Sequence, residues 1–121
     1  MNEKPKILYV DDEFINLLLF KINFSKKYEV FTAENGLMGL ELLDNNHDIS
    51  VVLSDMKMPA MNGIEFIIKA KAKYPKISYI ILTGYEITKE IQEALNSGLI
   101  VKYFRKPFNI SEIDSEIETL W

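Results

Sequence analysis

The chain has 121 residues, of which 48% are hydrophobic and 26% are charged, a composition typical of a globular domain and not of a disordered segment. No apolar stretch approaches the ~20 residues that span a bilayer, and the N-terminus lacks the apolar region of a signal peptide, so we expect a cytoplasmic protein. The absence of cysteine excludes disulfides, thiolate metal ligands and a cysteine nucleophile, and the net charge of −4 argues against direct binding to nucleic acid.

Strand-like and helix-like segments alternate along the chain. In chain order, the short apolar runs that predict strands are residues 6–10, 28–32, 50–54, 78–82 and 101–105. Apolar residues recur at helical spacing between and after these runs, in residues 13–25, 35–45, 63–74, 87–97 and 111–120. The third and fourth strand-like runs are nearly continuous, as in parallel strands covered on both faces, whereas the second alternates and favours an edge position.

Two of the helical segments have a well-marked apolar side. In the first segment, these residues are Ile15, Leu18, Leu19 and Ile22. In the last segment, they are Ile110, Ile113, Ile117 and Leu120. We expect the last set to face the core, with Ser111 as the residue that caps the helix.

The alternation of strands and helices predicts an α/β fold with one doubly wound, five-stranded parallel sheet, right-handed crossovers and helices on both faces. Of the two common strand orders, the flavodoxin-like order 2-1-3-4-5 suits five strands. This order places the carboxyl ends of the first and third strands side by side, where ligands bind in such sheets. We expect one domain over residues 1–121.

Polar side chains of complementary chemistry follow four of the predicted strands. They are Asp11 and Asp12 after the first strand, Asp55 after the third, Thr83 after the fourth and Lys106 after the fifth. Three carboxylates packed together raise one another's pKa values, and a hard divalent cation such as Mg²⁺ relieves this repulsion. A carboxylate can also attack a phosphoryl group, whose charge a cation, an ammonium group and a hydroxyl can stabilise. The residues therefore predict a site for Mg²⁺ and a phosphoryl group.

The segments that carry these residues resemble those of a known family. They are Asp11–Glu13, the Ser54–Gly63 stretch, Leu82–Tyr85 and Lys106–Phe108. In this order and at these strand ends, they are similar to a two-component response-regulator receiver domain. The resemblance covers essentially residues 5–120 and is specific because all four segments occur together.

The resemblance implies a role for each matched residue. Asp55 matches the phosphoacceptor, and Asp11 and Asp12 match the acidic pair that binds Mg²⁺ or Mn²⁺ with Asp55 and the Lys57 backbone carbonyl. The remaining matches are Thr83 for the switch hydroxyl, Lys106 for the lysine that pairs with the phosphoryl group and Tyr103 for the switch aromatic residue.

These matches imply a function in a phosphorelay. A sensor histidine kinase or a histidine phosphotransfer protein would donate the phosphoryl group to Asp55, and the domain would then change conformation to control a partner protein or a fused output domain. Such a domain catalyses its own phosphorylation and slow dephosphorylation but turns over no metabolite. We expect no direct contact with nucleic acid or a membrane.

The chain departs from the family pattern in three places. Gly84 occupies a position where Ala is more usual, and Phe14 one where Pro is often found. The segment from Gly98 to Tyr103 is one residue longer than receivers commonly have, so we expect a longer or bulged connection into the fifth strand. This difference leaves open whether Tyr103 acts as the switch residue.

Other functions remain open at this stage. A pseudo-receiver would bind partners without phosphorylation, although such domains usually lack one of the acids or the lysine. A phosphatase of the haloacid dehalogenase type needs a second acid two residues after its nucleophile, where this chain has Lys57. The sequence also leaves open whether the domain acts alone or was excised from a longer protein.

Overall fold

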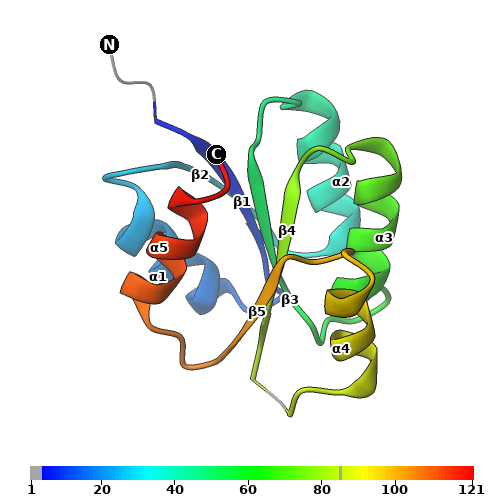
Figure 1. Cartoon of the computed structure of the whole chain (residues 1–121). Coiled ribbons are helices and arrows are strands. Elements are labelled where there is room, and N and C mark those ends of the chain that lie inside the picture. The colour runs from blue at the N-terminus through cyan, green and yellow to red at the C-terminus, as the bar shows by residue number, and fades with distance from the viewer. Residues whose placement is uncertain (1–3, 85) are drawn as a thin grey trace.

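A parallel sheet of five strands forms the centre of the computed structural model, which describes residues 4–84 and 86–121 (Figure 1). The strands are β1 (Lys6–Val10), β2 (Glu29–Ala33), β3 (Val51–Asp55), β4 (Ser78–Thr83) and β5 (Lys102–Arg105). The helices are α1 (Phe14–Phe24), α2 (Gly36–Asn45), α3 (Gly63–Lys73), α4 (Lys89–Asn96) and α5 (Ile110–Glu118). The strand order is β2-β1-β3-β4-β5 and each neighbouring pair is parallel, so the predicted fold class and strand order are confirmed.

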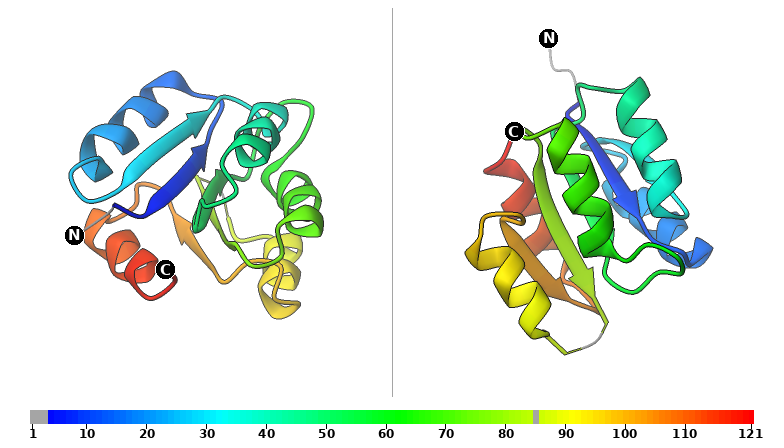
Figure 2. Two further views of the ribbon diagram at one scale, coloured as in Figure 1. Left: turned by 90° about the horizontal axis from the view of Figure 1, so that it is seen from above. Right: turned by 90° about the vertical axis from the view of Figure 1, so that its right-hand side faces the viewer.

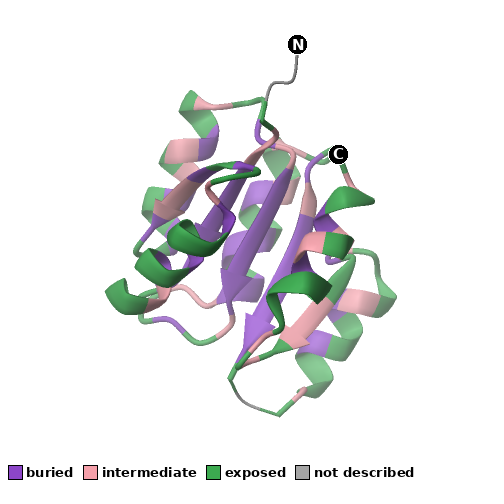
Figure 3. Cartoon of the chain, turned by 90° about the vertical axis from the view of Figure 1, so that its left-hand side faces the viewer, coloured by how far each residue is buried: buried purple, intermediate pink, exposed green. Residues whose placement is uncertain are grey.

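Helices cover both faces of the sheet (Figures 1 and 2). Helices α1 and α5 pack on one face and α2, α3 and α4 on the other, so the sheet separates two apolar clusters. Along β1, Ile7 and Tyr9 belong to the first cluster and Leu8 and Val10 to the second, as strand alternation requires. The central strands β1, β3 and β4 are mostly buried, and β2 is an edge strand as predicted (Figure 3). Within the described residues, every helix is too short or too polar to span a bilayer.

The apolar side that the sequence marks on α1 does not face the sheet. The buried residues of α1 are Leu17, Phe20 and Phe24. Five other large apolar side chains are between 42% and 66% exposed, namely Phe14, Ile15, Leu18, Leu19 and Ile22. Because α1 is apolar almost all around, spacing alone does not select its packed side. The aromatic rings decide it: Phe20 packs on Tyr9 and on Phe24, with ring centroids 4.4 Å apart in both pairs.

Helix α5 also differs in detail from the prediction. Its N-cap is Asn109, whose side chain accepts a hydrogen bond from the Glu112 amide, so the expected cap at Ser111 is wrong. Ile113 and Ile117 are buried as predicted, whereas Ile110 is exposed. The helix begins at Ile110, and its first turn therefore lies at the surface.

The connection from α4 to β5 accommodates its additional length without a bulge in the strand. Gly98 has a φ of 83°, a left-handed conformation that favours glycine, and it follows the end of α4. Ile100 then enters the core beside α4. The Val101 amide donates to the Tyr79 carbonyl at 2.9 Å, and β5 begins at the next residue.

Ala60, in the loop between β3 and α3, has a φ of 67°, which is unfavourable for a residue with a Cβ. Replacing Ala60 with Gly should relieve this strain and raise the free energy of unfolding by about 0.5–1 kcal/mol, measured by urea denaturation. The same substitution at Ala72, an exposed position within α3, should lower it by about 1 kcal/mol. A loss of stability in both variants would contradict the strain at Ala60.

Candidate functional site

Three carboxylates meet at the carboxyl edge of the sheet. Asp11 and Asp12 follow β1, and Asp55 ends β3; because these two strands are paired, with Val10 opposite Ser54, the acids lie close together. One ligand oxygen from each of the three acids lies within 4.8 Å of the others. Asp11 is fully buried and Asp55 is 7% exposed, whereas Asp12 is exposed. The structure thus assembles the acidic cluster that the sequence predicts.

Lys106 joins two of these acids. Its Nζ donates to Asp11 Oδ2 at 2.8 Å and to Asp55 Oδ1 at 3.2 Å. The loop that carries Lys106 is fixed to the end of β4 because the Lys106 amide donates to the Thr83 carbonyl at 2.7 Å. The following Lys106–Pro107 peptide bond is cis. The ammonium group therefore lies between the ends of β1 and β3, as expected for a cation that neutralises this cluster.

Burial and mutual charge perturb the ionisable groups of the cluster. Burial raises the pKa of Asp55, as do the nearby charges of Asp11 and Asp12, and the opposing effect of Lys106 is smaller than their sum. Burial also acts to raise the pKa of Asp11, but hydrogen bonds from Lys106, Tyr9 and the Glu13 amide outweigh it and lower the pKa. Burial lowers the pKa of Lys106 less than its two carboxylate partners raise it. The ammonium of Lys106 therefore stays charged, while burial makes the ionised form of Asp55 costly.

This donor set fits a hard divalent cation. Mg²⁺ prefers oxygen ligands and commonly uses one or two carboxylates together with waters and phosphate oxygens. Burial is the largest cause of the raised pKa of Asp55, with smaller contributions from Asp11 and Asp12, and a bound cation would stabilise the buried carboxylate in its charged form. The acidic cluster could therefore bind a metal ion.

The other predicted residues lie around the cluster. Exposed Lys57 lines a hollow of about 670 Å³ together with Asp12, Asp55, Gly84 and Lys106. Thr83 is buried at the end of β4, while Tyr85, in the same predicted segment, lies outside the described residues.

Tyr103 is half-buried in β5, opposite Ile81 of β4. Strand alternation places the side chains of Ile81 and Thr83 on one face of the sheet, where Tyr103 packs against the cluster under α4. Thr83 and Tyr103 thus share a face, which is the arrangement that a switch pair needs.

Two residues at the site were missed from the sequence. The Tyr9 hydroxyl donates to Asp11 Oδ2 at 2.5 Å, and the Asn16 amide donates to the same oxygen at 3.1 Å. Burial raises the pKa of Tyr9, as does its hydrogen bond to Asp11, so the hydroxyl remains protonated and acts as a donor. Strand alternation could have indicated Tyr9, because residues two apart in a strand point to the same face. No comparable feature of the sequence indicates that Asn16 contacts Asp11.

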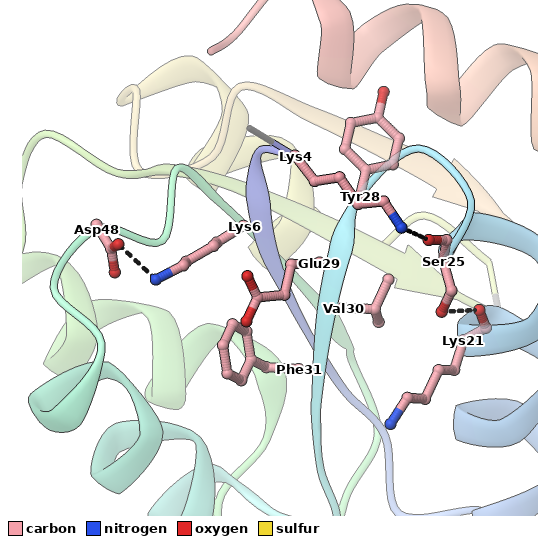
Figure 4. A pocket seen from close by; sticks show the side chains of 9 residues that line it. All are labelled: Lys4, Lys6, Lys21, Ser25, Tyr28, Glu29, Val30, Phe31 and Asp48. Atoms are coloured by element: carbon pink, nitrogen blue, oxygen red, sulfur yellow. Dashed lines mark hydrogen bonds and ion pairs between the residues drawn. The ribbon is translucent and has the colours of Figure 1, made fainter. Parts of the chain in front are cut away.

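A second hollow, of about 720 Å³, lies beside β2 (Figure 4). Two of the lysines that line it are engaged by neighbouring groups of the protein: Lys4 donates to the Ser25 carbonyl, and Lys6 pairs with Asp48 at 2.6 Å. The hollow is remote from the acidic cluster and shares no lining residue with the hollow above Asp55. We assign it no chemical role.

Comparison with known proteins gives a consistent family assignment. The family of response regulator receiver domains matches residues 7–118. A curated relative, the sporulation initiation phosphotransferase F of Bacillus subtilis, is 39% identical over 119 residues, which cover 98% of this chain and 93% of that protein. A chemotaxis protein CheY homolog of Campylobacter jejuni is 31% identical over 117 residues, which cover 93% of this chain and 89% of that protein.

Solved structures agree with the sequence comparison. A response regulator receiver domain protein from Clostridium thermocellum superimposes with a TM-score of 0.89 at 32% identity, covering 95% of this chain and 92% of that one. A structure described as adenylate cyclase from Rhodopirellula baltica superimposes with a TM-score of 0.91 at 35% identity, covering 97% of this chain and 87% of that one. The chain belongs to the family of response regulator receiver domains of two-component signalling.

Proposed function

We propose that this domain is a phosphorylation-driven switch in a phosphorelay, in which Asp55 accepts a phosphoryl group from a phosphohistidine in a Mg²⁺-dependent reaction. The observation that carries the proposal is the position of the Lys106 ammonium between Asp11 and Asp55, beside an open hollow that a phosphoryl group could enter. The relative from Bacillus subtilis, which is named a phosphotransferase, supports this reaction class.

The residues of the site account for the transfer. An Asp55 carboxylate oxygen forms a bond to phosphorus as the bond from phosphorus to the donor nitrogen breaks, and the imidazole leaves with that electron pair. Lys106 moves part of its hydrogen bonding from the acids to a phosphoryl oxygen. A bound Mg²⁺, held by Asp11, Asp12, Asp55 and the Lys57 backbone carbonyl, supplies the charge stabilisation that the transferred group requires.

Phosphorylation would then bias an equilibrium between two conformations. The phosphoryl group on Asp55 adds negative charge and acceptor oxygens at the end of β3, and it attracts the Thr83 hydroxyl and the Lys106 ammonium. Inward movement of Thr83 leaves space on the face that it shares with Tyr103, whose ring can fill it. We assign the readout to the surface formed by α4, β5 and α5.

We assign the exposed apolar side of α1 to the protein that donates the phosphoryl group. This side borders the site, because a groove lined by Leu19, Phe108 and Ile110 shares Asn16 and Lys106 with the hollow above Asp55. An exposed patch of large apolar side chains typically marks a protein interaction surface. A donor that covers it would have its phosphohistidine close to Asp55.

Phosphorylation can be tested without the donor protein. Incubation with acetyl phosphate and Mg²⁺, followed by intact-mass measurement, should add one phosphoryl group to the parent protein. Asp55→Asn should abolish the added mass because the amide is not a nucleophile, and EDTA should prevent it. Asp48→Asn, which removes an exposed carboxylate paired with Lys6, should be labelled like the parent. Undiminished labelling of Asp55→Asn would show that the phosphoacceptor assignment is wrong.

A further inference from the structure

Tyr9 connects the apolar core to the acidic cluster. Its ring is fully buried between β1 and α1, against Phe20, and its hydroxyl reaches Asp11 Oδ2 at 2.5 Å. Hydrogen bonds from a neutral donor to a carboxylate at this distance are strong and directional. The hydroxyl thus contacts an acid of the site from the side of the core, although it does not itself line the hollow above Asp55.

The hydrogen bonds of Asp11 are unevenly distributed between its two oxygens. Oδ2 accepts hydrogen bonds from Tyr9, Asn16 and Lys106. A carboxylate oxygen offers about two acceptor positions, so these three donors leave Oδ2 with no spare capacity. Among the described residues, Oδ1 accepts from the Glu13 amide at 2.9 Å. This arrangement leaves acceptor capacity on Oδ1 and fixes the rotation of the carboxylate.

We infer that Tyr9 is a positioning residue of this site, whose hydroxyl fixes Asp11 so that Oδ2 serves Lys106 while Oδ1 remains available to a divalent cation. The inference rests on the cation site of the proposed function. Groups that orient a metal-binding side chain commonly alter metal affinity when they are removed. Tyr9 does not touch the transferred group, and it acts through Asp11 alone.

The chain contains a matched control for the loss of this hydroxyl. Tyr28 is buried in the same apolar cluster, between α1 and α5, and its hydroxyl donates to the carboxylate of Asp114. Asp114 lies in α5 and is not part of the acidic cluster at the carboxyl edge. Tyr9→Phe and Tyr28→Phe therefore remove the same kind of hydrogen bond from the same layer, and only the first bond reaches the site.

Mg²⁺ binding to the unphosphorylated protein, measured by isothermal titration calorimetry, tests the inference. Tyr9→Phe should weaken the affinity about tenfold, the lower end of the range for such orienting groups, whereas Tyr28→Phe should leave it unchanged. Both variants should melt at a lower temperature than the parent protein. In the absence of metal, Tyr9→Phe should also lose exchange protection at the Glu13 amide, because a rotating Asp11 no longer holds that bond.

Two results would overturn the inference, and they are distinguishable. If the parent binds Mg²⁺ and Tyr9→Phe keeps both its affinity and the protection of the Glu13 amide, Tyr9 serves only the packing of the core. If the parent binds no Mg²⁺, the proposed cation site fails together with the inference, irrespective of whether Asp55 can be phosphorylated.

Discussion

Replacing Gly63 with Ala is expected to lower the free energy of unfolding by about 3 kcal/mol and to slow phosphorylation of Asp55. A Cβ at Gly63 would lie 2.4 Å from the Asp55 carbonyl oxygen and 2.9 Å from Ile81 Cδ1. The isoleucine can change its rotamer, but the carbonyl belongs to the backbone of Asp55, the proposed phosphoacceptor. Relief of the clash therefore has to move Asp55 itself, and a displacement of about 1 Å can cost a site about 100-fold in rate.

Urea denaturation and the rate of labelling by acetyl phosphate measure the two effects. Gly84→Ala is the matched control, because Gly84 lines the hollow above Asp55 but a Cβ added there would meet no heavy atom of the described residues within 4 Å. We expect this variant to be at least as stable as the parent, since Ala restricts the unfolded chain. If Gly63→Ala and Gly84→Ala lose equal amounts of stability and labelling rate, the close approach of α3 to Asp55 is not what requires glycine at position 63.

The sequence predicts the acidic cluster well because topology alone determines its position. Asp11 and Asp55 each follow a short apolar run, and parallel strands in the order 2-1-3-4-5 must bring the ends of the first and third strands together. The position of Lys106 is predicted in the same way, because it follows the carboxyl end of the fifth strand. No side-chain conformation has to be known to place these residues at one edge of the sheet, which explains why their predicted proximity is confirmed.

Features that depend on side-chain packing could not be predicted in this way. The packed side of α1 is chosen by the fit of Phe20 against Tyr9, whereas the spacing of Leu18 and its neighbours fits a helix with either side buried. The cap of α5 is similar in kind, since Asn109 and Ser111 are both good capping residues and only the path of the preceding loop selects between them. The contact of Tyr9 with Asp11 also requires the three-dimensional structure.

Lys106→Met is expected to destabilise the metal-free protein by about 2–3 kcal/mol at neutral pH. The substitution keeps the length and apolar contacts of the side chain but removes the positive charge that Asp11 and Asp55 share. Asp11 is fully buried and Asp55 is 7% exposed, so solvent compensates the lost counterion poorly. Thermal and urea denaturation in the presence of EDTA measure this effect.

The destabilisation should depend on pH in a defined direction. In the parent protein the pKa of Asp11 is lowered by Lys106 and its other donors, so the stability from this pairing is present above the unfolded-state pKa and is lost as pH falls through the folded-state pKa. The difference between Lys106→Met and the parent should therefore shrink as the pH is lowered into the range where these acids become protonated. A difference that stays constant would point to lost packing instead of lost charge.

Mg²⁺ should partly restore the stability of Lys106→Met, because the cation and the ammonium compensate the same carboxylates. The rise in melting temperature on adding Mg²⁺ is therefore expected to be larger in this variant than in the parent, since no ammonium already compensates the charges of Asp11 and Asp55. Lys73→Met removes a surface ion pair to Asp44, far from the cluster, and should respond to Mg²⁺ as the parent does. If Mg²⁺ stabilises Lys106→Met no more than the parent, Lys106 and the cation do not compensate the same carboxylates. The mechanism in which Lys106 shifts from the acids to the phosphoryl group then loses its basis.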